Sequence, residues 1–168
     1  MRLLLIIVGL LAAATAQAQD TNLFRIGPLS LIFPVTWQFD GSKRPIEGRG
    51  PDGEHAIVSY RGLKPDAPES VREKHMALVR GFAETEMPGL ATKNGTVVKP
   101  VTEVALGGRR VMFTAVSQGS KSLRDYYFVQ YLLGSPSAMA YFTFEGYGNA
   151  AEASQRLDKI VATQQWAD

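Results

Sequence analysis

Residues 126–133 read Tyr-Tyr-Phe-Val-Gln-Tyr-Leu-Leu, a run dominated by aromatic and aliphatic side chains that is typical of a β-strand. Successive side chains of a strand point to opposite faces of the sheet. One face of this strand would carry Tyr126, Phe128 and Leu132, and the other would carry Tyr127, Val129, Tyr131 and Leu133. A strand that is apolar on both faces is covered on both sides. Residues 138–144 show a similar pattern, so the centre of the sheet is predicted to lie between two layers.

Two amphipathic helices are predicted to supply these layers. The first spans about residues 67–87, with Asp66 as N-cap, Glu69 completing a capping box, and Met87-Pro88-Gly89 as its end. Its apolar stripe would comprise Val71, His75, Leu78, Val79 and Phe82. The second helix spans about residues 149–165 and is capped by Asn149. Its core stripe would comprise Ala153, Leu157, Ile160 and Val161. One helix is expected on each side of the sheet.

The remaining strands follow from shorter patterns. Residues 23–26, 29–33 and 55–61 are strand-like, and Val35, Trp37 and Phe39 alternate with polar residues. Residues 96–106 contain Pro100, which predicts an edge strand or a break. Gly107-Gly108 indicates a hairpin, and residues 119–122 a further turn. Together these elements predict one α+β domain, residues 19–168, an α/β/α sandwich around a mainly antiparallel sheet.

The N-terminus has the features of a bacterial secretory signal peptide. Arg2 precedes the apolar run 3–11, and Ala16-Gln17-Ala18 forms a cleavage site. Cleavage after Ala18 would leave 150 of the 168 residues in the periplasm. An uncleaved membrane anchor is the alternative. No later apolar run reaches the length of a membrane span, so none is expected after cleavage.

Composition narrows the classes of partner and chemistry. The chain has no cysteine, which excludes disulfides, a thiol nucleophile and the acylated cysteine of a lipoprotein. Without Arg2 there are 17 basic and 16 acidic residues. This balance does not provide the dense positive surface that nucleic acid requires. We therefore expect no nucleic acid partner.

Catalytic and metal-binding motifs are absent from the sequence. The two histidines, His55 and His75, lie on different elements without metal-ligand spacing, and His75 is expected to be a structural residue on the first helix. There is no G-x-S-x-G or S-x-x-K motif, and residues 119–122 lack the spacing of a phosphate-binding loop. A Ser-His-Asp triad assembled from distant residues stays possible. We expect no enzyme activity, cofactor or metal.

Two features have a possible binding role. Residues 40–54 are rich in glycine, proline and charge and predict a long surface loop, either functional or merely mobile. Its candidate binding residues are Lys43, Arg44, Glu47, Arg49, Asp52 and Glu54. The second feature is an aromatic cluster, which would line a ligand pocket between sheet and helix or, as we favour, pack in the core. It consists of Tyr126, Tyr127, Phe128, Tyr131, Tyr141, Phe142, Phe144 and Tyr147.

Residues 29–37, Leu-Ser-Leu-Ile-Phe-Pro-Val-Thr-Trp, resemble the opening of the DcrB and PsbP-like superfamily, in which a short strand runs into a proline and then a tryptophan. The strands 125–129 and 140–144 and a C-terminal helix closing on Trp166 fit the same resemblance. It implies an α/β/α sandwich without a shared active site, whose members bind partners: DcrB-type proteins, extrinsic photosystem subunits, a Ran-binding import factor and secretion chaperones. The chain departs from DcrB-type lipoproteins in lacking their cysteine, and from the secretion chaperones in having a signal peptide.

Three functional hypotheses follow. The leading one is a non-enzymatic periplasmic binding or accessory protein whose partner is a protein of the cell envelope. The second is an immunity protein that neutralises a secreted toxin in the periplasm. The third is a small-molecule or lipid binder that uses the aromatic cluster. The sequence leaves the identity of the partner and the oligomeric state open.

Overall fold

The structure, a computed structural model, describes residues 21–167, and the predicted signal peptide 1–18 lies outside them. The described chain forms β1 (Thr21–Ile26), β2 (Leu29–Pro34), β3 (Gln38–Asp40), β4 (Ile46–Arg49), β5 (His55–Gly62), α1 (Glu69–Lys93), β6 (Thr96–Gly107), β7 (Arg110–Lys121), β8 (Arg124–Gly134), β9 (Ala138–Tyr147), α2 (Ala150–Val161) and β10 (Gln165–Trp166). The larger sheet has the order β3-β4-β5-β9-β8-β7-β6, and the smaller has the order β1-β2-β10. Neighbouring strands pair antiparallel in both sheets.

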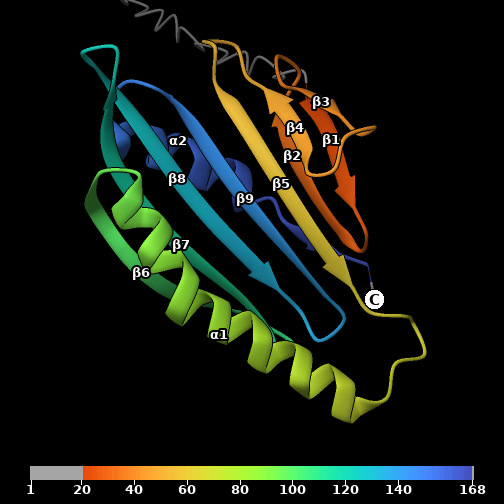
Figure 1. Cartoon of the computed structure of the whole chain (residues 1–168). Coiled ribbons are helices and arrows are strands. Elements are labelled where there is room, and N and C mark those ends of the chain that lie inside the picture. The colour runs from red at the N-terminus through yellow and green to blue at the C-terminus, as the bar shows by residue number, and fades with distance from the viewer. Residues whose placement is uncertain (1–20, 168) are drawn as a thin grey trace, which may run out of the picture.

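The larger sheet is the middle layer of three, as predicted (Figure 1). Helix α1 packs on one face of it, against β6, β7 and β8. The opposite face carries α2 together with the smaller sheet, and these elements share one apolar core with the larger sheet. The α1 side leaves β5, β4 and β3 uncovered, because α1 lies along the β6 edge (Figure 1).

Strand β8 is buried on both faces, which confirms the central prediction. Tyr127 and Tyr131 belong to the core beneath α2, and Leu132 belongs to the core beneath α1. The neighbouring strand β9 is similar, with Phe142 and Phe144 fully buried. These strands position the rest of the molecule, because both helices pack against them.

Helix α1 differs from its predicted form at both ends. It begins at Glu69 after Pro68, with no side-chain cap, so the capping box of Asp66 and Glu69 is wrong. It also continues through Pro88 to Lys93. The reason is packing: buried side chains recur every fourth residue along its length, at His75, Val79, Ala83, Met87 and Ala91. Val71 and Leu78, assigned to the stripe from the sequence, are exposed.

Helix α2 is capped by Asn149 as predicted, but it ends at Val161 and not near residue 165. Beyond the helix, Thr163 Oγ1 accepts a 2.8 Å hydrogen bond from the backbone of Ile32 in β2. Trp166 then lies opposite Leu29 in a short strand, β10. The edge of β2 therefore provides the hydrogen-bond partners that end the helix. No helix among residues 21–167 is both long and apolar enough to cross a bilayer.

The predicted surface loop 40–54 is wrong, because strand β4 lies within it. Ile46 and Gly48 point into the protein and alternate with Glu47 and Arg49, so the segment pairs with β3 and β5. The alternation is only four residues long and includes a glycine, which hid it among turn-forming residues. The strand expected around Val35 is also shorter than predicted, since β3 begins at Gln38.

The edge and hairpin predictions have mixed outcomes. Strand β6 is an edge strand whose pairing shifts register around Pro100, and Gly107-Gly108 leads into β7, both as predicted. Residues 119–121 belong to β7, so the predicted 119–122 turn is misplaced. The turn is formed by Ser122 and Leu123, whose φ angles are 53° and 61°. Neither residue is a glycine, so the turn could not be placed at Ser122-Leu123 from a glycine signal.

Candidate binding cleft

The six candidate residues of segment 40–54 do not form one site. Lys43 Nζ and Glu47 Oε2 form a 2.6 Å ion pair next to the β3–β4 turn. Arg44 lies in that turn and donates hydrogen bonds to two backbone carbonyls. Arg49 is exposed at the end of β4, whereas Asp52 and Glu54 belong to the β4–β5 turn. The structure brings Asp52 and Glu54 together on one cleft and leaves the other four outside it.

Glu54 is the buried group of the β4–β5 turn, with only 4% of its surface exposed. Its Oε1 accepts a 2.6 Å hydrogen bond from the phenol of Tyr127 and also pairs with the guanidinium of Arg156 on α2. Burial, followed by this hydrogen bond, raises the pKa of Tyr127, so the phenol stays protonated and donating. A carboxylate buried this deeply is held by a cation and a donor, as expected for a buried charge.

Gly50 makes this arrangement possible. A Cβ atom at residue 50 would lie 2.5 Å from Glu54 Oε2 and 2.8 Å from Trp37 Cζ2. Its backbone N–H donates a 3.0 Å hydrogen bond to the carbonyl of Glu54 and closes the turn. Only a glycine therefore lets the turn, the buried carboxylate and the indole of Trp37 pack together.

Next to Glu54, the β4–β5 turn, β2 and α2 enclose a cleft of about 420 Å³. We call it the α2 cleft. Its apolar lining comprises Ile32, Phe33, Pro34, Trp37, Pro51 and Ile160. Its charged lining comprises Asp52 and Glu54 from the turn, and Arg156 and Lys159 from α2. Lys159 forms no hydrogen bond or ion pair with the other described residues.

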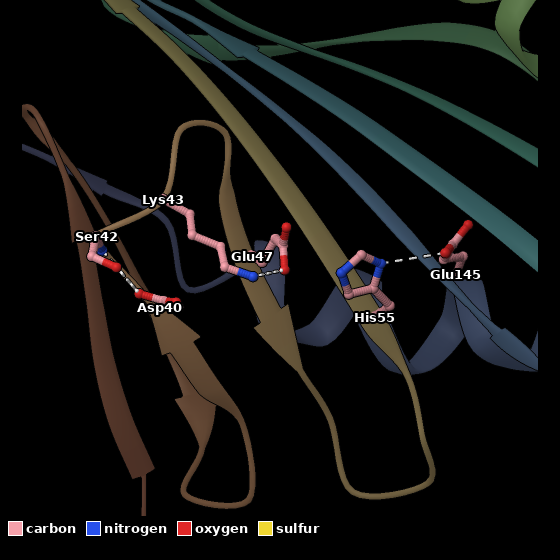
Figure 2. A network of polar contacts seen from close by, with 6 residues as sticks. All are labelled: Asp40, Ser42, Lys43, Glu47, His55 and Glu145. Atoms are coloured by element: carbon pink, nitrogen blue, oxygen red, sulfur yellow. Dashed lines mark hydrogen bonds and ion pairs between the residues drawn. The ribbon is translucent and has the colours of Figure 1, made fainter.

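A second polar surface lies on the uncovered side of the larger sheet. Figure 2 shows Asp40 with Ser42, Lys43 with Glu47, and His55 with Glu145, from β3 across to β9. His55 Nδ1 lies 3.3 Å from Glu145 Oε1. The side chains pair with one another along this surface, which is therefore a ladder of exposed, mutually satisfied polar groups.

Two titratable groups beside this ladder, Lys121 and Tyr126, have shifted pKa values. Lys121 Nζ lies 3.5 Å from the phenol oxygen of Tyr126. The hydrogen bond with Tyr126 raises the pKa of Lys121, and burial raises the pKa of Tyr126. Both shifts move away from neutrality, whereas general acids and bases are usually moved toward it.

His75 is buried in the packing of α1, as expected for a structural residue, with 5% of its surface exposed. Its Nε2 has no hydrogen-bond partner in the described part of the chain, and burial lowers its pKa. His55 and His75 lie apart, on β5 and α1. Residues 21–167 contain no group of three or more side chains able to hold a metal ion.

The aromatic cluster is divided by the sheet, and only Tyr126 and Tyr147 of it line a cavity, together with charged side chains. Tyr127, Tyr131, Phe142 and Phe144 are in the core beneath α2, and Tyr141 packs against Phe82 of α1 on the opposite side. Tyr126 contacts Phe128 and Tyr147 edge-to-face at the far end of the strands. The core-packing interpretation therefore describes the cluster better than the ligand-pocket interpretation.

Sequence reasoning missed most of the α2 cleft. The cleft combines residues from β2, the Trp37 segment and α2, which are far apart in the chain. One signal was present: Arg156 and Lys159 flank Leu157 and Ile160 of the apolar stripe, so charge borders the buried face of the helix. Their position opposite Asp52 and Glu54 is visible only in the folded protein.

Comparison with known proteins identifies the fold. No protein-family model matches the chain, and no curated protein matches its sequence significantly. Among solved structures, cyanobacterial PsbP (CyanoP) from Synechocystis sp. PCC 6803 superposes with a TM-score of 0.55 at 11% identity, covering 94% of this chain and 99% of that one. LpqN of Mycobacterium tuberculosis, described as involved in cell envelope biogenesis, gives a TM-score of 0.53 at 8% identity, covering 92% and 88%.

A crystal structure from Bacteroides thetaiotaomicron VPI-5482 gives a TM-score of 0.58 at 10% identity, covering 89% of this chain and 49% of that one. The present chain thus spans about half the length of that protein. These similarities confirm, for the fold, the PsbP-like resemblance inferred from the sequence. At identities of 8–11% they concern the fold alone.

Proposed function

We propose that this protein is a non-enzymatic accessory protein of the bacterial cell envelope that binds a partner protein through the α2 cleft. The occupant is a segment of the partner that presents an apolar side chain followed by an acidic residue. The apolar side chain lies on Ile32 and Pro34, and the acidic residue faces Lys159.

The observation that carries this proposal is that exposed apolar side chains lie beside Lys159, a cation that pairs with none of the described residues. Ile32 at the cleft mouth is 37% exposed, although it is an isoleucine beside the buried core. Lys159 at the rim has no partner among the described residues. A volume of about 420 Å³ is at the small end of ligand sites and suits one or two side chains of a docked segment. Apolar contacts would supply affinity, and the charge would set register.

Two further observations support binding without catalysis. The pKa values of Lys121 and Tyr126 are shifted away from neutrality. The charged groups of the α2 cleft are Asp52, Glu54, Arg156 and Lys159, and no histidine lines it. A non-enzymatic role is consistent with both.

The envelope location is part of the same proposal. The leader predicted for residues 1–18 would export the chain, and cleavage after Ala18 would release the domain. The shared fold with LpqN, a protein of envelope biogenesis by its description, is consistent with this location.

Affinity capture with paired variants tests the proposal. The tagged protein, expressed from the full sequence, is recovered from envelope fractions as wild type, Ile32→Asp and Val104→Asp. Val104 is a matched control, because it is 41% exposed but lies on edge strand β6. We expect one protein to be captured by wild type and Val104→Asp and to be lost with Ile32→Asp.

The captured protein is then purified and titrated against all three forms. We expect binding to weaken at least about ten-fold for Ile32→Asp, because a buried carboxylate replaces an apolar contact. Equal binding by Ile32→Asp and wild type, or no specific capture by wild type, would reject the proposal.

A further inference from the structure

A second cavity, of about 530 Å³, lies at the other end of the smaller sheet. We call it the β1–β5 pocket. It is enclosed by the β1–β2 turn, the β3–β4 turn and the middle of β5. Its apolar walls include Ile26, Pro45 and Val58, and its polar groups include Arg25, Arg44 and Tyr60. None of its lining residues lines the α2 cleft.

The charge of the β1–β5 pocket is entirely positive. Two arginines line it, and no aspartate or glutamate is among the described lining residues. Within residues 21–167 neither Arg25 nor Arg44 forms an ion pair. Two arginines that line one cavity without an acidic residue make it positive, and a positive cavity attracts an anion.

Arg44 is held in place before any ligand arrives. Its Nη1 donates to the carbonyl of Gly41 at 2.7 Å and to the carbonyl of Lys43 at 2.6 Å. The other N–H groups of the guanidinium remain available, and a planar fork of this kind matches the oxygens of a carboxylate or a phosphate. Preorganisation of this cation lowers the entropy lost on binding.

Tyr60 is fixed in the wall of the pocket by two glycines. A Cβ atom at Gly27 would lie 2.0 Å from the phenol oxygen, and one at Gly62 would lie 2.3 Å from it. Gly27 also has a φ of 54°, which glycine adopts without strain. Burial raises the pKa of Tyr60, so the phenol is a neutral hydrogen-bond donor.

We propose that the β1–β5 pocket binds a small amphiphilic anion, with a carboxylate or phosphate head between Arg25 and Arg44 and a short alkyl body on Ile26, Pro45 and the ring of Tyr60. The volume falls within the usual range for small-molecule sites, about 300–1,000 Å³. This site is independent of partner binding at the α2 cleft, and its test stands alone.

Calorimetric titration of the protein with octanoate, octyl phosphate, inorganic phosphate and 1-octanol tests the site. These probes separate the contribution of the charged head from that of the alkyl body. Comparison of octanoate with octyl phosphate distinguishes a carboxylate head from a phosphate head. We expect at least one alkyl anion to bind more tightly than both inorganic phosphate and octanol. Both the charge and the alkyl chain contribute to such a site.

Matched variants locate the binding. Arg25→Gln with Arg44→Gln should weaken the alkyl anion at least about ten-fold, because charge-assisted hydrogen bonds are lost. Arg49→Gln, an exposed arginine outside this pocket, should bind like wild type. Tyr60→Phe keeps the ring packing and should produce a smaller loss.

Three outcomes would overturn the proposal. The first is no binding of either alkyl anion at concentrations up to about 10 mM, near the limit expected for ligands of this size. The second is equal affinity for octanol or for inorganic phosphate. The third is an affinity for the alkyl anion that is the same in wild type, in the double variant Arg25→Gln with Arg44→Gln, and in Arg49→Gln.

Discussion

The phenol of Tyr127, on the central strand β8, donates a 2.6 Å hydrogen bond to the buried carboxylate of Glu54, 73 residues earlier in the chain. This contact joins the core of the larger sheet to the wall of the α2 cleft. Arg156 completes the group from α2, so the larger sheet and the α2 layer meet at one carboxylate. The shape of the cleft therefore depends on the same interaction that holds the β4–β5 turn against the core.

Removing either partner of this contact is expected to destabilise the protein. Tyr127→Phe should lower the free energy of unfolding by about 1 kcal/mol, and Glu54→Gln by about 2 kcal/mol, because a buried charge-assisted hydrogen bond is lost. In urea denaturation, the double variant should be less destabilised than the sum of the two singles.

Tyr131→Phe provides the control, because Tyr131 donates a similar 2.6 Å hydrogen bond to Asp158. Its effect should add to that of Glu54→Gln. Additive effects of Glu54→Gln and Tyr127→Phe, within about 0.3 kcal/mol, would show that the two side chains are not coupled.

His75 is expected to make the protein sensitive to acid. Burial lowers its pKa from the ordinary value of 6.5, so the unfolded chain binds a proton more readily than the folded chain. The folded protein therefore has its full stability above about pH 6.5, and it loses part of this stability as the pH falls through the lowered pKa of His75. His75→Gln should reduce the loss of stability between pH 7 and pH 5, measured by thermal unfolding.

His55→Gln is the matched comparison for this prediction. His55 is partly exposed beside Glu145, and its replacement should leave the His75 contribution in place. An unchanged pH dependence in His75→Gln would assign the acid sensitivity to other groups.

Substitutions in the β7–β8 turn are expected to stabilise the protein. Ser122 and Leu123 both adopt positive φ angles, which cost a non-glycine residue about 1 kcal/mol each. Leu123 is also fully exposed, so its side chain makes no compensating contact. Ser122→Asn with Leu123→Gly should raise the free energy of unfolding by about 1–2 kcal/mol. A double variant that is less stable than wild type in urea would argue against this backbone conformation.

Asn149 is expected to stabilise α2 through its side chain. Its Oδ1 accepts hydrogen bonds from the backbone of Ala151 at 2.9 Å and of Glu152 at 3.2 Å. Asn149→Ala should cost about 1 kcal/mol, whereas Asn149→Asp should retain most of the stability because it keeps the accepting oxygen. Equal unfolding midpoints for the alanine and aspartate variants would contradict a capping role.

The parts of the fold that could be predicted are those decided by local pattern. The two-sided burial of β8 follows from residues 126–133, and the cap of α2 follows from Asn149. The extension of α1 through Pro88 could not be predicted, because the contact between Met87, Ala91 and β7 outweighs the helix-ending signal. Similarly, β10 depends on the free edge of β2 and not on its own two residues.

The candidate site was predictable only in fragments. The charged residues of segment 40–54 were identified from composition, but the short alternation of β4 separates them. Glu54 turns inward to Tyr127, whereas Glu47 turns outward to Lys43. The cation that pairs with Glu54, Arg156, comes from α2 about a hundred residues later, and the spacing along the chain does not predict such a contact.

The most direct test of partner binding at the α2 cleft is site-specific photo-cross-linking in living cells. A photoreactive amino acid is placed at Ile32, at the mouth of the α2 cleft, or at Val104, on the β6 edge. We predict one discrete cross-linked product with an envelope protein from position 32, which disappears when Lys159→Glu is added, and no such product from position 104. Cross-linking at position 104 alone, or the same product from both positions, would contradict binding at the α2 cleft.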